Sequence, residues 1–274
     1  MKLDFTEKTV LVTGASMGIG RGLAGCFARD GANLALIDLP ARKTELDAFA
    51  DELERAHGIR TWRFSADLTE PDGPERLHDE VVMVAGPVQV LVNNAGICSY
   101  GCFADMDLAR MEKIVALNCI GYMKLMRLVL PSMMDKDDGA ILNVSSVSAF
   151  QPLPSLAVYA ATKAFTLSLS EAVTGELPWR SKIVVATMNP PFTRTALIND
   201  AGIPRDFIPF TISFKTIDEV VEQGYRAFKQ GKLCTVPGWQ NRALHLVMVR
   251  LLPRKAVSLV GRLTMRRWSD YVRI

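Results

Sequence analysis

Tyr159 and Lys163 stand four residues apart in the segment YAATK. That spacing places both side chains on one face of a helix. A free phenol has a pKa near ~10 and is a poor base at neutral pH, but a neighbouring ammonium lowers that pKa by direct charge interaction. The pair is therefore predicted to supply a base, or in the reverse direction an acid, for a hydroxyl proton. A Tyr and a Lys at this spacing are also common as a surface pair, so the prediction needs support from the rest of the chain.

A glycine-rich segment, TGASMGIG, covers residues 13–20 and joins a predicted strand to a helical pattern that ends at Gly31. Glycines permit a tight turn and close approach of the backbone to a diphosphate, and the free N–H groups at a helix start favour an anion. The order strand, turn, helix predicts a dinucleotide site, although a turn that only packs helix against strand stays open. The residues expected to hold the cofactor here are Gly14, Ser16, Met17, Gly18, Ile19 and Gly20.

Asp38 ends the second predicted strand, eighteen residues past Gly20. A carboxylate there accepts hydrogen bonds from the adenosine ribose hydroxyls and repels a phosphate on that ribose, which favours NAD over NADP. Arg42 and Lys43 follow closely and keep NADP open, but mobile surface cations contribute little. The other role for Asp38 is a helix cap ahead of Pro40.

The scaffold is predicted from seven apolar segments of strand length that alternate with segments of helical period. Most are continuously hydrophobic, as in VLVT and LALID, which is expected when helices cover both faces of a sheet. The alternation predicts a single-domain, Rossmann-like α/β three-layer sandwich with about seven parallel strands and right-handed crossovers. The predicted strands are 9–13, 33–38, 61–65, 88–93, 140–145, 182–189 and 232–236, and a long helix is predicted from about Asp107 to Met133.

These motifs together resemble the short-chain dehydrogenase/reductase family, over residues 6 to about 237. The family's glycine motif has the form TGxxxGxG, as at 13–20. The other matching motifs, in the family's order, are Asp67 in SADL, NNAG at 93–96, Asn118, the serines at 145 and 146, YAATK at 159–163 and NPPFTRT at 189–195.

The resemblance implies a nicotinamide-dependent oxidoreductase with the catalytic set Asn118, Ser146, Tyr159 and Lys163. Ser146 is chosen over Ser145 because it stands thirteen residues before Tyr159, as the family's catalytic serine does. Ser146 would hydrogen-bond the substrate oxygen, and Asn118 would hold a water that connects Lys163 to solvent. The rival function is a dinucleotide-bound regulatory or scaffold protein with vestigial catalysis.

The resemblance also implies cofactor contacts outside the glycine turn. Residues 67 and 68 would lie at the adenine ring, the turn at 93–96 on the adenosine side, and Thr195 near the nicotinamide amide or a phosphate. The family usually has Pro-Gly where this chain has Pro190-Pro191, so the backbone contact to the carboxamide is expected to differ. The contacts expected here are Asp67, Leu68, Asn94, Ala95, Gly96, Tyr159, Lys163, Pro190, Phe192 and Thr195.

The segments expected around the substrate oxygen are apolar, which predicts a hydrophobic secondary alcohol or ketone that is steroid-, lipid- or aryl-like. Residues 190–214, rich in proline and aromatic side chains, are interpreted as a substrate lid; Arg194 and Arg205 are its candidates for an anionic group. The alternative is that the apolar residues only pack this segment on the domain. Substrate contacts are expected from Cys98, Tyr100, Phe150 and Phe192.

Residues 1–238 are predicted to form the catalytic domain, and residues 239–274 a basic extension with eight Lys and Arg against one Asp. From residue 256, basic and apolar residues recur on roughly opposite faces of a predicted helix, namely Lys255, Arg262, Arg266 and Arg273 against Val257, Val260, Trp268 and Tyr271. Such a helix can contact a membrane surface peripherally. Equally, it can cover the substrate pocket or a neighbouring subunit.

The composition excludes several other classes. Residues 1–238 carry a net charge of −4, which argues against a nucleic-acid binder. Five scattered cysteines and a first segment without a secretory pattern favour the cytoplasm. The three histidines are far apart and Cys98 and Cys102 have no second pair, so no metal site is expected. A homo-oligomer is expected from the family resemblance alone.

Overall fold

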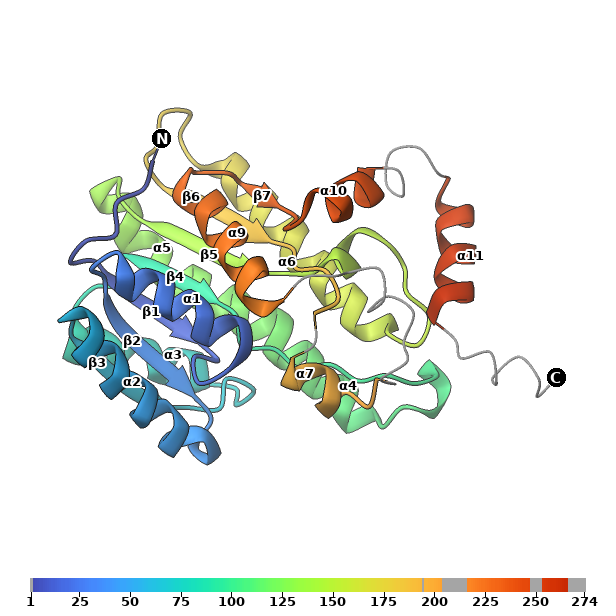
Figure 1. Cartoon of the computed structure of the whole chain (residues 1–274), viewed down its shortest axis with the longest axis horizontal. Coiled ribbons are helices and arrows are strands. Elements are labelled where there is room, and N and C mark those ends of the chain that lie inside the picture. Colours follow the sequence, from blue (N-terminus) through green and yellow to red (C-terminus); the bar gives the residue numbers. More distant parts are fainter. Residues whose placement is uncertain (1, 194, 204–215, 247–252, 266–274) are drawn as a thin grey trace.

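Seven parallel strands form one sheet in the order β3-β2-β1-β4-β5-β6-β7 (Figure 1). The computed structural model describes residues 2–193, 195–203, 216–246 and 253–265. The strands are β1 (Thr9–Thr13), β2 (Asn33–Asp38), β3 (Thr61–Ser65), β4 (Val90–Asn93), β5 (Ala140–Val144), β6 (Val184–Met188) and β7 (Cys234–Thr235). The predicted parallel α/β sandwich is confirmed.

Four strands are shorter than the sequence predicted, because some flanking apolar residues are buried by packing and not by strand pairing. Val88 lies outside the ladder of β4, and Ile183 lies outside that of β6. Both are nevertheless buried in the same hydrophobic cluster. A run of apolar residues therefore marks burial better than it marks the ends of a strand.

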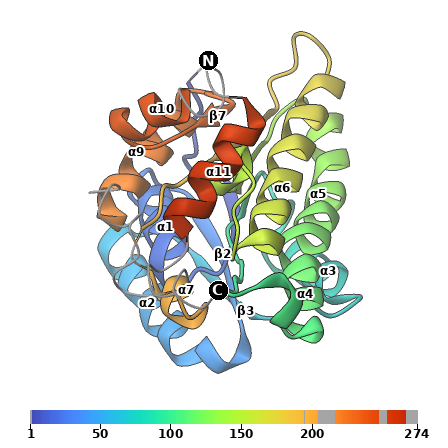
Figure 2. The same ribbon diagram turned by 90° about the vertical axis from the view of Figure 1, so that its right-hand side faces the viewer.

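Helices cover both faces of the sheet, as Figure 2 shows. One face carries α1 (Gly18–Arg29), α2 (Lys43–His57) and α9 (Ile217–Lys229). The other carries α3 (Gly73–Ala85), α5 (Tyr122–Lys136) and α6 (Ala157–Glu176), with α4 (Leu108–Val115) against α6. The remaining elements include η1 (Pro40–Arg42), η2 (Phe103–Asp105), η4 (Val147–Phe150), α7 (Ala196–Asp200), α10 (Trp239–Leu246) and α11 (Arg254–Met265).

The strand residues divide between two hydrophobic cores. Val10 and Val12 of β1 pack with Phe27 on one side, whereas Leu11 packs with Leu125 on the other. Because each strand is covered on both faces, alternate residues are equally apolar, which explains the continuous hydrophobic runs.

The predicted long helix contains a break in its hydrogen-bonding pattern. Residues 108–136 are helical throughout, but a π-helical segment η3 (Ala116–Gly121) separates α4 from α5 and has Asn118 in its middle. A π segment adds a residue to the turn and often marks a functional site. Apolar periodicity alone gave no sign of it.

The C-terminal helix α11 packs beside the loop that follows β5 (Figure 2). Val257 and Gly261 are buried, and a Cβ on Gly261 would lie 3.2 Å from the Pro152 carbonyl oxygen. The buried face of α11 therefore covers part of the domain, which favours the second of the two predictions for this segment. The predicted residues Arg266, Trp268, Tyr271 and Arg273 lie outside the described residues.

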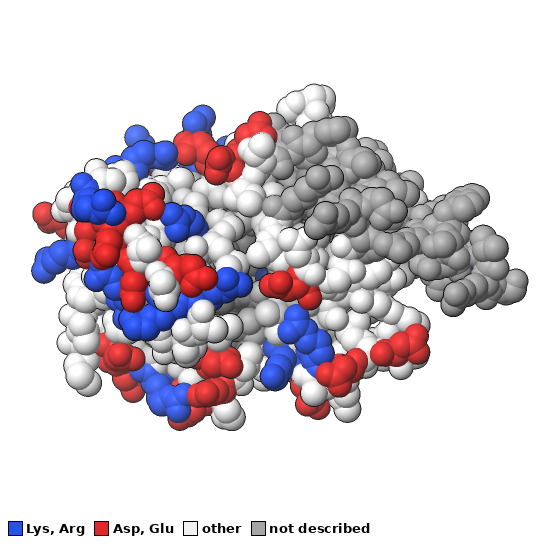
Figure 3. Space-filling view, turned by 60° about the horizontal axis from the view of Figure 1, so that its bottom comes forward, with Lys and Arg blue, Asp and Glu red and all other residues white. Residues whose placement is uncertain are grey.

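Charged side chains of both signs are interspersed on the face shown in Figure 3. In the described part of the chain many of them form ion pairs, such as Arg21 with Glu52 at 2.7 Å and Lys8 with Asp138 at 2.8 Å. This distribution differs from the single-sign patch that a nucleic-acid surface requires.

Two glycines of α1 provide a test of the fold at the glycine turn. A Cβ on Gly20 would lie 2.1 Å from the Gly14 carbonyl oxygen and 2.4 Å from Asn94 Nδ2, whereas Gly25 has nothing within 4 Å. Gly20→Ala should destabilise the protein by ~1–3 kcal/mol through overpacking. Gly25→Ala should stabilise it by about 1 kcal/mol, because alanine is the better helix former. Denaturant unfolding measures both, and a neutral Gly20→Ala would contradict the close packing of this turn.

Candidate active site

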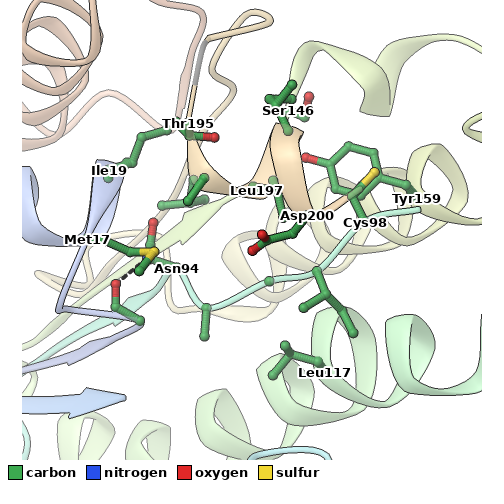
Figure 4. Close-up of a pocket in the computed structure, with 18 of the residues that line it drawn as sticks. Met17, Ile19, Asn94, Cys98, Leu117, Ser146, Tyr159, Thr195, Leu197 and Asp200 are labelled. Atoms are coloured by element: carbon green, nitrogen blue, oxygen red, sulfur yellow. Dashed lines mark hydrogen bonds between the residues drawn. The ribbon is translucent and has the colours of Figure 1, made fainter. Parts of the chain in front are cut away.

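A cleft of about 690 Å³ lies at the carboxyl ends of the strands (Figure 4). It opens where β2 and β4 flank β1 and the strand order changes direction, the usual ligand position in such sheets. Its lining includes these predicted residues: Gly14, Met17, Gly18, Ile19, Asp38, Asp67, Leu68, Asn94, Ala95, Gly96, Cys98, Ser146, Tyr159, Lys163, Pro190, Phe192 and Thr195. Ser16, Gly20, Tyr100, Asn118 and Phe150 are not among the described lining residues.

The glycine turn has the backbone that a diphosphate site requires. Gly14 and Gly18 have φ values of +65° and +55°, which favour glycine. At the start of α1, Met17 offers no side-chain cap and the first turn holds no acidic residue. The N–H groups there are therefore available to an anion, and the turn fits a dinucleotide.

Asn94 fixes the turn after β4 to the glycine turn. Its Nδ2 donates to the carbonyls of Thr13 at 2.9 Å and Gly14 at 3.1 Å. Thr13 Oγ1 in turn accepts from the backbone N–H of Asn94 and of Ala95, at 2.9 and 3.0 Å. These bonds hold the turn after β4 against the glycine turn, and residues of both turns line the cleft.

Asp38 is held at the cleft by Ser16. The Asp38 Oδ2 accepts from the Ser16 hydroxyl at 2.6 Å and from its backbone N–H at 3.0 Å. Ser16 thus orients the carboxylate, although Ser16 itself is not among the described residues that line the cleft. The alternative capping role is not seen, since Leu39 is the N-cap of η1 and no side chain caps that turn.

Tyr159 and Lys163 lie on α6, and Ser146 follows β5. Figure 4 shows Tyr159 and Ser146 on the same side of the cleft. Lys163 Nζ donates to the Val144 carbonyl at 2.9 Å and lies 5.7 Å from the centre of the Tyr159 ring. Ser145, which was not predicted to be catalytic, donates its hydroxyl to the Lys163 carbonyl at 2.8 Å and so connects the end of β5 to α6.

Burial dominates the ionisation of Tyr159 and Lys163. It raises the pKa of the Tyr159 phenol, although a hydrogen bond with the Ser146 hydroxyl acts to lower it, and it lowers the pKa of Lys163 to about 8. The prediction that the phenol pKa lies below its ordinary value is therefore wrong for the chain by itself, because the cost of placing a phenolate in an apolar wall is the largest effect.

Asn118 braces the turn at residues 96–97 from its π segment. Its Oδ1 accepts from the Ile97 N–H at 3.1 Å, and its Nδ2 donates to the Ile97 carbonyl and to Thr162 Oγ1 at 2.9 and 3.1 Å. A Cβ on Gly96 would lie 3.3 Å from Asn118 Oδ1 and 3.6 Å from Lys163 Nζ. The missing side chain keeps open the space between Asn118 and Lys163. The water-holding role of Asn118 stays a prediction.

An apolar cluster forms the wall beside Tyr159. Cys98 is buried there, and burial raises the pKa of its thiol to about 12, so the thiol stays neutral. Tyr100 packs against this cluster but is not among the described residues that line the cleft, while Phe150 ends the short η4 turn. Among the described residues the cluster consists of Cys98, Leu153, Leu156, Ala160, Ala201 and Ile203, with Tyr100, Tyr159, Phe192, Leu197 and Ile198 against it.

Three charged residues of the cleft were missed by the sequence analysis. Arg110 and Lys113 come from α4, and Asp200 comes from α7. Arg110 donates to the Cys98 carbonyl at 2.8 Å. Helical spacing on α4 gave no sign of which face meets the cleft. Arg194 and Arg205, the basic residues that were predicted, lie outside the described residues.

The Pro190-Pro191 segment is fixed by its carbonyl groups. The Val147 N–H donates to the Pro190 carbonyl at 3.0 Å, next to Ser146, and Thr193 Oγ1 donates to the Pro191 carbonyl at 3.0 Å. Two prolines are thus accommodated without a donor of their own.

Comparison with known proteins decides the family. A sequence model described as short chain dehydrogenase matches residues 8–205. The chain belongs to the short-chain dehydrogenase/reductase family. It is therefore an oxidoreductase that depends on a nicotinamide cofactor.

Individual relatives agree with this assignment. Oxidoreductase UcpA of Escherichia coli K12 is 36% identical over 193 residues, 70% of this chain and 72% of UcpA. A short-chain dehydrogenase from Sphingobium yanoikuyae in complex with NADPH is 34% identical with a TM-score of 0.78, covering 86% of this chain and 90% of that one. A bulky-bulky ketone specific alcohol dehydrogenase from Comamonas testosteroni is 27% identical with a TM-score of 0.74, covering 96% of each chain.

The side chains of this dehydrogenase divide the work of the reaction. The dinucleotide, when bound, supplies or accepts the hydride. The Ser146 and Tyr159 hydroxyls can hydrogen-bond one substrate oxygen, and Tyr159 can pass a proton to or from it. The Lys163 ammonium, while charged, lowers the energy of a phenolate at Tyr159.

The buried Lys163 predicts a pH-dependent stability. Its pKa is about 8 in the folded chain against 10.5 as the ordinary value, so between these values the unfolded state binds more protons and stability rises with pH. The unfolding free energy of the wild type minus that of Lys163→Met should increase by roughly 1–2 kcal/mol from pH 7 to 9.5. Denaturant titrations at each pH measure this difference in unfolding free energy. The buried cysteine thiols are present in both proteins, so their contributions cancel. A difference that stays constant with pH would show that Lys163 is not shifted.

Proposed function

We propose that this dehydrogenase transfers a hydride between NAD and a hydrophobic secondary alcohol or ketone of steroid, lipid or aryl type. The observation that carries the proposal is the meeting of Ser146, Tyr159 and Lys163 in a cleft whose wall beside the phenol is apolar. The Ser146 and Tyr159 hydroxyls would hydrogen-bond the substrate oxygen, and the apolar wall would contact the carbon groups on either side of that oxygen.

The size and composition of the wall support a bulky substrate. Leu156, Leu197, Ile198 and Ile203 line the cleft on the side of Cys98. The Comamonas testosteroni relative, named for bulky-bulky ketones, aligns over 96% of this chain. Arg110 of α4 and Asp200 of α7 also line the cleft, and Arg110 donates to the Cys98 carbonyl, but the side chains packed around the phenol are those of the apolar cluster.

Asp38 supports NAD as the preferred dinucleotide. Its carboxylate ends β2, lines the cleft and is oriented by Ser16. The two nearby cations have partners in their own segment: Arg42 pairs with Glu45 at 3.3 Å, and Lys43 with Asp47 at 2.8 Å. Arg42 also lines the cleft. Since the Sphingobium yanoikuyae relative was solved with NADPH, both dinucleotides belong in the test.

The reaction is tested by nicotinamide absorbance with a panel of bulky aryl and steroid ketones and small polar ones. We expect turnover of the bulky ketones and a loss of turnover by orders of magnitude in Tyr159→Phe and Lys163→Ala, with dinucleotide binding retained. Tyr225→Phe, which removes a phenol hydroxyl bonded to Asp30 in the other core, should turn over normally. Turnover of small polar ketones alone would refute the substrate class. Saturable binding without any turnover would favour the regulatory protein.

The cofactor preference is tested by Asp38→Ala. Loss of the carboxylate removes the acceptor for the ribose hydroxyls and the repulsion of a ribose phosphate, so the ratio of kcat/KM for NADH to that for NADPH should fall by about tenfold or more. Each variant is its own control, because both dinucleotides are measured on the same preparation. An unchanged ratio would remove Asp38 from cofactor selection.

A further inference from the structure

Lys163 keeps a positive charge in surroundings that offer little to stabilise it. Its side chain is 3% exposed, and its Nζ has one hydrogen-bond acceptor in the described structure, the Val144 carbonyl. The titratable groups that face it are the thiols of Cys119 and Cys98 and the phenols of Tyr159 and Tyr122, and burial raises the pKa of all four. None of these is an anion at neutral pH, so the ammonium has no counter-ion among them.

Tyr122 lies against Lys163 and is not among the described residues that line the cleft. Its ring centre is 5.3 Å from Lys163 Nζ, slightly closer than the Tyr159 ring at 5.7 Å. The ammonium therefore has two aromatic rings near it, one from α5 and one from α6. Distances below about 6 Å allow attraction between a cation and the electron-rich face of a ring, and this attraction is stronger where water is excluded.

The position of Tyr122 is fixed by the fold. Its side chain is 2% exposed at the first residue of α5, directly after the π segment. Its hydroxyl donates to the same Val144 carbonyl that accepts from Lys163, at 3.4 Å, and its own carbonyl accepts from Asn93 Nδ2 at 3.4 Å. Since burial keeps the hydroxyl protonated, Tyr122 acts on Lys163 through its ring and not as an anion.

We propose that Tyr122 is a positioning residue whose ring holds Lys163 charged and in place beside Tyr159. Its effect on turnover rests on the proposed function, because it acts through Lys163 alone. Its effect on the ionisation of Lys163 does not depend on any reaction. The two effects can therefore be measured separately.

The direct test is an NMR titration of the full chain with carbon-labelled lysine, in which the Lys163 signal is identified by its absence from Lys163→Met. Tyr122→Phe keeps the ring and should leave the Lys163 pKa within about 0.3 unit of the wild type. Tyr122→Leu removes the ring and should lower that pKa by about one unit. Leu125→Ala is the control, since it opens space at a fully buried position of the same helix in the core cluster without a ring against Lys163.

A second series keeps the test valid if Tyr122→Leu fails to fold. Phenylalanines with one, two and three ring fluorines, placed at position 122, retain the shape of Phe and progressively weaken the negative ring face. The Lys163 pKa should fall with each fluorine. Three results would overturn the proposal: a Lys163 pKa that does not change along the fluorine series, a Lys163 pKa in Tyr122→Leu that equals that of the wild type, or a Lys163 pKa in Tyr122→Phe that falls as far as in Tyr122→Leu.

The pH profile of kcat/KM connects the two effects. In Tyr122→Leu the alkaline limb should move to lower pH by the same amount as the Lys163 pKa. If the Lys163 pKa falls and the alkaline limb of kcat/KM does not move, the role of Tyr122 stands, and the ammonium has no part in the proposed reaction. If the limb moves and the pKa does not, Tyr122 does not act through Lys163 and the proposal is overturned.

Discussion

The site depends on the burial of one ammonium group next to one phenol. Lys163 Nζ donates to the Val144 carbonyl and lies 5.3 and 5.7 Å from the ring centres of Tyr122 and Tyr159. Removal from water lowers the lysine pKa and raises the phenol pKa, so each group is least stable in its charged form. A dinucleotide with a positively charged ring would change this balance in favour of the phenolate. We therefore expect the ionisation of Tyr159 to depend on whether a dinucleotide occupies the cleft.

Several elements of the fold bring this pair and its neighbours together. β5 supplies Val144 and leads to Ser146, α6 supplies Tyr159 and Lys163, and the π segment leads to Tyr122. Asn118 connects the turn after β4 to α6 through Ile97 and Thr162, as described above. Segments distant in sequence are therefore fixed to one another by buried hydrogen bonds, which are costly to leave unpaired.

Much of this arrangement could be predicted from the sequence. Continuous apolar runs predicted the parallel sheet, and the order of strand, glycine turn and helix predicted the cleft with Asp38 at its edge. The pKa of Tyr159 could not be predicted, because it depends on how deeply the fold buries the phenol. Tyr122 and the π segment were missed for a similar reason: their role arises from contacts between helices, not from spacing along the chain. The expected homo-oligomer stays a prediction.

We expect Tyr159 to lose its proton readily only when an oxidised dinucleotide occupies the cleft. An ultraviolet titration of tyrosinate, taken as the difference between the wild type and Tyr159→Phe, measures the phenol pKa with and without the oxidised dinucleotide. The phenol pKa should lie above the ordinary value of ~10 in the free chain and fall by several units on binding. Equal pKa values in the two states would contradict it.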